Sequence, residues 1–176
     1  MDFPSVRASF RSRKAVRERN AMNERPNFAG LSGLEAIRAM MDGGRDIATI
    51  GQTLDFTLVE ADFGKAVFEA RPSERHLNPN GIVHGGYAAT LLDSCTGMAI
   101  QSALPAGRTF TTLELKVNYI RVMAHDGSPV RATGQTIHVG RTTATAEGRI
   151  TDGEGRLLAH ATTTCLMLDI PSPRDR

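Results

Sequence analysis

The sequence predicts an α+β fold in which one long helix packs against an antiparallel sheet. An apolar run with helical spacing extends from about His84 to Ala103, and segments that alternate apolar and polar residues lie on both sides of it. Short glycine turns separate the later segments, and such turns join antiparallel neighbours. Two strands, one helix and four strands in this order favour a helix packed on a sheet.

The composition is that of an ordinary soluble domain. The chain has 176 residues, a net charge of +2 and 40% hydrophobic residues, so it suits one domain and indicates no nucleic-acid or membrane partner. Cys95 and Cys165 lie in separate apolar runs, which is typical of buried thiols in a reducing compartment. With no apolar signal core near the N-terminus, we expect a cytoplasmic protein. The histidines lack ligand-like spacing, so we expect no metal and no cofactor.

Residues 1–30 are expected to form a basic N-terminal extension. Within residues 1–25, basic residues outnumber acidic ones by seven to three. A solvated helix or a frayed arm accounts for this pattern, and a transit peptide or a nucleic-acid-binding arm would also be basic. Glu18 and Glu24 weaken the transit-peptide interpretation.

A short amphipathic helix and a linker are predicted over residues 31–50. Ser32 and Glu35 have the spacing of a capping box, and Gly43-Gly44 ends the run. The helix is therefore expected over residues 33–42, with apolar residues at helical spacing on one face: Leu34, Ile37, Met40 and Met41.

The main domain is predicted over residues 51–170, followed by a tail at 171–176. Residues 53–58 alternate as in a strand, a turn is expected at 62–64, and residues 66–70 alternate again. After the long helix, strands are expected at 109–122, 129–139, 141–152 and 155–168. Because Asp126-Gly127, Gly140 and the turn at 152–155 separate them, these four strands are predicted to pair with their sequence neighbours.

One carboxylate interrupts the apolar run of the long helix. Asp93 lies beside a stripe formed by Ala88, Leu91, Leu92, Cys95, Met98 and Ala99. Its neighbours at helical spacing are small residues, so the carboxylate has open space beside it, which indicates a pocket. A solvated Asp on a helix edge is the alternative.

The start of this helix favours the pocket. The pair Gly85-Gly86 allows a ligand to approach the backbone, and the first N–H groups of a helix lack partners and carry the positive end of its dipole. Such groups can polarise a carbonyl oxygen. Asp93 lies about 14 Å along the helix axis from His84. That separation is too long for one small reaction centre in one subunit, and it indicates a site shared across a dimer.

These residues resemble a known enzyme family. Asn78, His84-Gly85-Gly86, Asp93 nine positions after the histidine, and the segment Thr111–Arg121 together resemble hotdog-fold acyl-CoA thioesterases of the phenylacetic-acid-degradation type. The resemblance covers about Gly51 to Leu168. It implies a hotdog fold, a central helix wrapped by an antiparallel sheet, with dimers joined edge to edge and commonly paired into tetramers.

The resemblance also implies roles for individual residues. The Gly85 N–H would hold the thioester carbonyl oxygen with help from Asn78, and Asp93 of the second subunit would act as general base or as nucleophile. Thr112, preferred over Thr111, would orient the water or the carboxylate. His84 would lie near the carbonyl and support the loop, although a purely structural histidine is equally compatible with its position.

Binding of an acyl-CoA substrate would involve further residues. Arg121 and Arg141 are the candidates for coenzyme A phosphates, and each could instead be a solvated arginine at a strand end. Gly86, Tyr87 and Thr90 are expected at the substrate, and Met98 is a further candidate for lining the acyl tunnel. The apolar lining suits an aryl or a medium-chain acyl group equally well.

Other functions fit the sequence less well. A serine esterase would need a G-x-S-x-G motif, and nucleotide-dependent enzymes would need their glycine-rich motifs; neither motif occurs. Hotdog hydratases use an Asp and a His in a different loop motif. A non-catalytic acyl-CoA sensor stays open, since some hotdog domains serve as sensors when joined to a DNA-binding segment and residues 1–25 are basic.

Overall fold

The computed structural model describes residues 30–43 and 49–170, so the expected N-terminal extension, apart from its last residue, and the tail at 171–176 lie outside the described residues. The helices are α2 (Gly33–Asp42), α3 (Ile50–Leu54) and α4 (Gly85–Ser102), with a short 3-10 helix at Glu74–His76. The strands are β1 (Phe56–Asp62), β2 (Lys65–Ala70), β3 (Arg108–Tyr119), β4 (Val130–Val139), β5 (Thr143–Thr151) and β6 (Leu157–Asp169).

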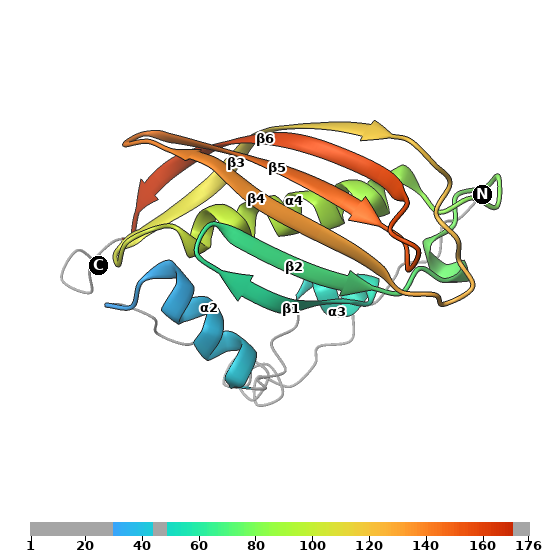
Figure 1. Ribbon diagram of the computed structural model, residues 1–176, viewed down its shortest axis with the longest axis horizontal. Helices are drawn as coiled ribbons and strands as arrows, with labels where there is room; N and C mark the ends of the chain where they lie inside the picture. The colour runs from blue at the N-terminus through green and yellow to red at the C-terminus, as the bar shows by residue number, and fades with distance from the viewer. Residues whose placement is uncertain (1–29, 44–48, 171–176) are drawn as a thin grey trace, which may run out of the picture.

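One antiparallel sheet wraps around helix α4. Its strand order is β1-β2-β4-β5-β6-β3, and every neighbouring pair is antiparallel. Helix α4 lies along the inner side of the curved sheet and packs against all six strands (Figure 1). This is the predicted hotdog fold, and it leaves β3 and β1 as the two edge strands.

The predicted apolar stripe of α4 faces the sheet. Leu91, Leu92 and Cys95 are fully buried there, and Met98 is half-buried. The helix comes so close to the sheet that a Cβ atom added at Gly134 of β4 would lie 2.1 Å from the Cys95 carbonyl oxygen. Only glycine fits at this contact, because real Cβ atoms do not approach backbone so closely.

Helix α2 agrees with its prediction. Ser32 and Glu35 form the expected capping box, and Ile37 is fully buried. The Gly33 N–H donates to the Leu104 carbonyl over 2.9 Å and so attaches α2 to the end of α4.

The prediction of a strand beginning at residue 53 was wrong at its start. Residues 50–54 form helix α3, and β1 begins only at Phe56. Asp55 has φ +57°, a left-handed conformation that ends the helix. The alternation of Leu54, Phe56 and Leu58 concealed this boundary, because helix α3 has only 5 residues and carries little periodicity.

The predicted pairing of the third and fourth strands was also wrong. β3 pairs with β6, while β4 pairs with β2 and β5. Residues 120–129 connect β3 to β4 across the molecule and do not form a hairpin. Met123 in this connection is buried against the core, so the segment follows a packed path from one edge of the sheet to its middle. The predicted pairings of β4 with β5 and of β5 with β6 are confirmed.

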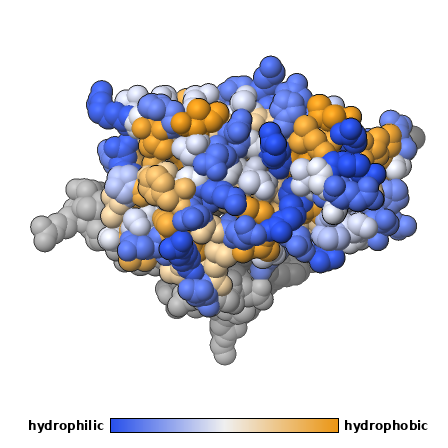
Figure 2. Space-filling model, viewed as in Figure 1, coloured by the Kyte–Doolittle hydropathy of each residue, from blue (hydrophilic) through white to orange (hydrophobic). Residues whose placement is uncertain are grey.

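The outer face of the sheet is mixed in character. On the face that carries β2, β4 and β5, hydrophilic and hydrophobic side chains are interspersed, and the apolar ones gather in separate groups (Figure 2). Within residues 30–43 and 49–170, no helix is long and apolar enough to cross a membrane.

Candidate active site

The start of α4 presents a free backbone N–H. His84 is the N-cap, and its ring Nδ1 accepts the Gly86 N–H over 2.8 Å. The Gly85 N–H makes no hydrogen bond within the part of the chain that the structure describes. It lies at the positive end of an 18-residue helix, so it can donate to an oxygen that gains negative charge.

The loop before α4 is organised by Asn78 and His76. The Asn78 side-chain oxygen accepts the N–H groups of Asn80 and Ile82, over 2.9 and 3.2 Å. The Asn78 side-chain amide nitrogen donates no hydrogen bond to another described residue and stays available to a ligand. The His84 N–H donates to the His76 carbonyl over 2.8 Å, which ties the two ends of the loop together.

The His76 ring anchors this loop in the core. It is 6% exposed, its Nδ1 accepts the Ser73 N–H over 3.0 Å, and it stacks on Tyr87 with 4.3 Å between ring centroids. Burial lowers the pKa of His76, with a further lowering from Arg75, so the ring favours its neutral form. Burial also raises the pKa of Tyr87 to about 12. Tyr87 therefore keeps its hydroxyl proton at neutral pH.

Asp93 is held by a side chain from strand β3. The Thr112 hydroxyl donates to Asp93 Oδ1 over 2.9 Å, and both side chains are half-buried. Thr111 is exposed. The sequence-based choice of Thr112 as the residue that reaches this carboxylate agrees with the contact.

The two cysteines lie behind this pair. Cys95 and Cys165 are buried free thiols, as predicted, and Cys165 is the partner of Thr112 across β3 and β6. Burial raises the pKa of Cys95 to about 12 and also raises the pKa of Cys165. Both thiols thus stay protonated at neutral pH, and neither is poised as a nucleophile.

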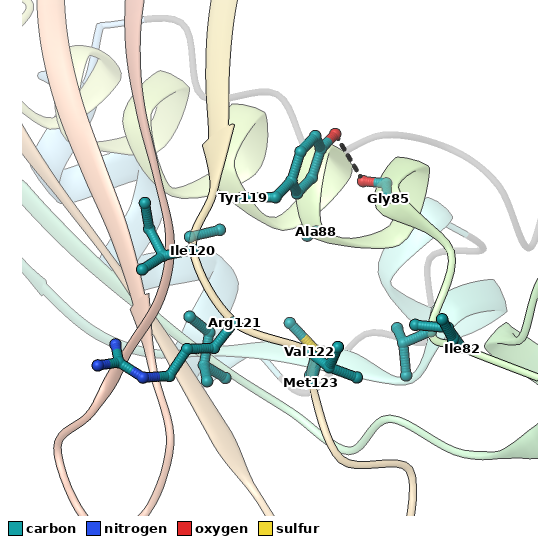
Figure 3. Close-up of a pocket in the computed structure, with 11 residues that line it drawn as sticks. Ile82, Gly85, Ala88, Tyr119, Ile120, Arg121, Val122 and Met123 are labelled. Atoms are coloured by element: carbon teal, nitrogen blue, oxygen red, sulfur yellow. Dashed lines mark hydrogen bonds between the residues drawn. The ribbon is translucent and has the colours of Figure 1, made fainter.

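A cavity of about 340 Å³ opens beside Gly85 (Figure 3). Residues from the α4 start, the end of β3 and β6 line it: Ile82, Val83, Gly85, Ala88, Tyr119, Ile120, Arg121, Val122, Met123, Leu158 and Ala159. The Tyr119 hydroxyl donates to the Gly85 carbonyl over 3.1 Å and fixes the ring beside the helix start. The lining is mostly apolar, as expected for a small-molecule site.

The candidate phosphate-binding arginines lie at opposite ends of β3. Arg121 lines the cavity and donates to the Leu157 carbonyl over 2.7 Å. The Arg141 carbonyl accepts from Arg108 at the other end of the strand, over 2.8 Å. Twelve residues of strand span roughly 36 Å, so the two arginines cannot reach one phosphate group within one subunit.

The predicted site residues likewise fall into two groups within one subunit. Asn78, His84, Gly85 and Gly86 surround the start of α4, whereas Asp93 and Thr112 lie about 12 Å further along its axis. Thr90 donates to the Gly86 carbonyl over 2.9 Å. Tyr87 is only 4% exposed and does not line the cavity, so its role at the substrate stays a prediction.

Sequence reasoning missed the contact between Tyr119 and Gly85 and the cavity wall formed by residues 120–123 and β6. One signal could have indicated the wall: the apolar residues Ile120, Val122 and Met123 continue past the end of the strand. The described residues contain no group of three or more His, Cys, Asp or Glu side chains placed to hold a metal ion.

Comparisons with known proteins agree with the fold. Residues 80–159, which include Gly85, Asp93 and Thr112, match the thioesterase superfamily. Mouse acyl-coenzyme A thioesterase 13 is 32% identical over 104 residues, 58% of this chain and 73% of that protein.

Two solved structures are also similar. A phenylacetic acid degradation-related protein from Ralstonia eutropha JMP134 has a TM-score of 0.65 and 27% identity, over 73% of this chain and 97% of that chain. A hypothetical thioesterase from Streptococcus pneumoniae, solved with coenzyme A, has a TM-score of 0.60 and 29% identity, over 66% of this chain and 88% of that chain. The chain therefore belongs to the thioesterase superfamily and is a thioester hydrolase.

Proposed function

We propose that the protein hydrolyses an aryl- or medium-chain acyl-CoA to the free acid and coenzyme A. The observation that carries the proposal is the Gly85 N–H, which has no hydrogen-bond partner among the described residues and lies at the wall of an apolar cavity. The Asp93 carboxylate of the same chain is held in place by Thr112. The substrate class is supported by the acyl-CoA activity in the name of the mouse relative and by the coenzyme A in the Streptococcus pneumoniae structure.

The chemistry follows from these groups. Asp93 takes a proton from water, and the resulting hydroxide attacks the thioester carbonyl carbon. The carbonyl oxygen becomes negative and is stabilised by the Gly85 N–H and the Asn78 amide. The C–S bond then breaks, the carboxylic acid forms, and the coenzyme A thiolate takes the proton that Asp93 had removed from water. In the alternative mechanism, Asp93 attacks the carbonyl carbon directly, coenzyme A leaves, and water hydrolyses the resulting anhydride. The Gly85 N–H and the Asn78 amide stabilise the carbonyl oxygen in the same way. General-base catalysis contributes about 10²–10⁴-fold, and an oxyanion donor contributes about 10²–10³-fold.

Two copies of the chain are needed to complete this site. Strand β3 is an edge of the sheet. Leu113 and Tyr119 in this strand are 58% and 57% exposed, and Ile120, directly after its end, is 48% exposed. Exposed apolar edges of this kind favour pairing with another strand. Pairing of β3 with β3 of a second copy would extend the sheet into the edge-to-edge dimer predicted from the sequence, and two such dimers could form a tetramer.

Charge argues against two registers of this pairing and favours a third, centred on Leu115. When two identical antiparallel strands pair about a twofold axis, one residue lies opposite the same residue of the other copy. This central residue determines which residues face each other along the rest of the two strands. If Glu114 or Lys116 were the central residue, its charge would lie directly opposite the same charge of the other copy, which is unfavourable. A centre at Leu115 places Glu114 of each copy opposite Lys116 of the other. All three side chains lie in the middle of β3.

This register brings the two groups of predicted site residues, one around the start of α4 and one at Asp93 and Thr112, close together across the dimer. With Leu115 at the centre, and with the irregularity in β3 between Thr112 and Glu114, Thr112 of one copy lies opposite Val117 or Asn118 of the other, within two residues of the Tyr119 that contacts Gly85. Thr112 is hydrogen-bonded to Asp93 over 2.9 Å, so the Asp93 carboxylate of one copy approaches the helix start of the other. The same antiparallel arrangement brings Arg141 of one copy toward the Arg121 end of the other, where both could meet coenzyme A phosphates.

Release of free thiol from a panel of aryl- and fatty-acyl-CoAs tests the function. We expect turnover of at least one class, and we expect Asp93→Asn to lower kcat about 10²-fold or more. Full activity in Asp93→Asn would refute the assigned base, and absence of thiol release from every substrate would refute the function.

A non-catalytic acyl-CoA sensor is the second candidate, favoured by the basic residues at 1–25. Tight acyl-CoA binding without thiol release, together with DNA binding that is lost when residues 1–25 are deleted, would favour the sensor. The retained Asp93–Thr112 pair favours the enzyme, because ligand binding alone does not require a positioned carboxylate.

A further inference from the structure

Two hydrogen bonds meet at the peptide group between Gly85 and Gly86. The Tyr119 hydroxyl donates to the carbonyl of this peptide over 3.1 Å, as Figure 3 shows. The N–H of the same peptide, which belongs to Gly86, donates to Nδ1 of His84 over 2.8 Å. The Tyr119 hydroxyl, the peptide and the His84 ring thus form one continuous chain of hydrogen bonds.

This series of hydrogen bonds determines which His84 nitrogen carries the proton. A neutral imidazole that accepts at Nδ1 must hold its proton at Nε2. Hydrogen bonds in series polarise one another, so a donor on the carbonyl makes the N–H of the same peptide a stronger donor. The His84 side chain is exposed beside Gly85, which leaves its Nε2–H free to donate to a bound ligand.

We propose that Tyr119 is a positioning residue for the hydrolysis: its hydroxyl, acting through the Gly85–Gly86 peptide, keeps His84 in the Nε2–H tautomer. The proposal rests on the proposed function. The His84 Nε2–H is then directed before the substrate arrives, next to the Gly85 that lines the cavity. Donors fixed in advance lose less free energy to reorganisation during the reaction.

The fit between Tyr119 and Gly85 supports this role. A Cβ atom added at Gly85 would lie 3.2 Å from the Tyr119 ring Cζ and 3.2 Å from its hydroxyl oxygen, so the ring rests directly on the glycine. Tyr119 is nevertheless 57% exposed, so core packing does not account for it. Phenylalanine would keep the ring contact and the cavity wall, and it would remove only the hydrogen bond.

The protein offers a matched control, because its two tyrosines both lie beside this turn. The Tyr87 hydroxyl has no hydrogen-bond partner among the described residues. Tyr87→Phe therefore removes a hydroxyl close to the same helix start without breaking the chain of hydrogen bonds to His84.

The tautomer test compares the full-length wild type with Tyr119→Phe and Tyr87→Phe, and thiol release is compared only between the wild type and Tyr119→Phe, because Tyr87 is itself an expected substrate residue. Imidazole tautomers are read from ¹⁵N NMR of the ring nitrogens, with the His84 signals assigned by their loss in His84→Asn. We expect the Nε2–H tautomer in the wild type and in Tyr87→Phe, and a mixture of tautomers in Tyr119→Phe. In thiol release, Tyr119→Phe is expected to lower kcat about three- to tenfold, the effect of one neutral hydrogen bond, with KM changed less than about twofold.

An Nδ1–H tautomer in the wild type, or an unchanged tautomer and kcat in Tyr119→Phe, would overturn the proposal. The NMR readout requires no turnover, so it decides the role of Tyr119 even if the wild-type protein releases no thiol from any acyl-CoA. That second result would overturn the proposed function and not the hydrogen-bond chain.

Discussion

Thr112 on edge strand β3 donates its hydroxyl proton to Oδ1 of Asp93 in the middle of helix α4, across 2.9 Å. The bond links the central helix to the strand that borders the open edge of the sheet. The carboxylate therefore lies close to this open edge, about 12 Å along the helix axis from the start of α4.

Removal of the Thr112 hydroxyl is expected to reduce catalysis. Thr112→Val keeps the shape of the side chain and leaves Asp93 Oδ1 without its donor, so kcat should fall about tenfold or more, as expected for a hydrogen bond to a charged group. Thr112→Ser keeps the hydroxyl and should retain most of the activity. Thr111→Val, at the exposed neighbouring position, is the matched control. Equal losses in Thr111→Val and Thr112→Val would argue against a specific role for Thr112.

Charge reversal on β3 tests the register of the dimer. In the Glu114→Lys variant, the substituted side chain of each copy faces Lys116 of the other, so like charges lie opposite each other on both sides of Leu115. We expect this repulsion to weaken the dimer by roughly 1–2 kcal/mol. The double variant Glu114→Lys, Lys116→Glu exchanges the charges and should restore association. Sedimentation at several concentrations measures the effect. A double variant as weak as the single one would contradict a centre at Leu115.

Gly134 tests the close contact between helix and sheet. In Gly134→Ala the new Cβ would lie 2.1 Å from the Cys95 carbonyl oxygen, so the strand or the helix must move. We expect a loss of about 2–3 kcal/mol in the free energy of unfolding, as for other overpacked cores. Gly153→Ala is the control, because a Cβ there meets nothing within 4 Å. Urea unfolding of both variants measures the difference, and equal stabilities would be inconsistent with this contact.

His76 should make the stability depend on pH. Burial lowers its pKa in the folded protein, while the unfolded chain titrates near the ordinary value of about 6.5. Above that pH the contribution is fully present. As the pH falls from about 6.5 toward the folded pKa, the unfolded chain binds a proton that the folded protein does not, and the free energy of unfolding decreases.

Urea unfolding of the wild type and His76→Asn at pH 7.5 and pH 5.5 would isolate this contribution. The wild type should lose more stability than His76→Asn between the two pH values. Identical losses would mean that His76 is not held neutral in the folded state.

Local patterns in the sequence predicted much of this molecule. The long apolar run located α4 and the Ser32–Glu35 spacing located α2, while the motif around His84 and Asp93 predicts both halves of the candidate site. Each of these features depends on residues close together in the chain, so the spacing of residue types is sufficient to predict it. The choice of Thr112 came from the resemblance to a family and agrees with the contact to Asp93.

Features that depend on distant pairing were missed. The pairing of β3 with β6 joins strands that are distant in the chain, so no local pattern predicts it. The Tyr119 contact with Gly85 joins residues 34 positions apart and exists only because β3 ends at the start of α4. Helix α3 was too short to leave a helical periodicity.

A mixing experiment tests the central claim, that the base and the carbonyl-polarising group come from different copies. Asp93→Asn and Asn78→Ala should each be nearly inactive alone. When the two variants are unfolded together and refolded, half of the dimers should be mixed, each with one intact site, so thiol release should recover to about a quarter of the wild-type rate. A mixture that stays at the level of the separate variants would contradict a site shared between copies.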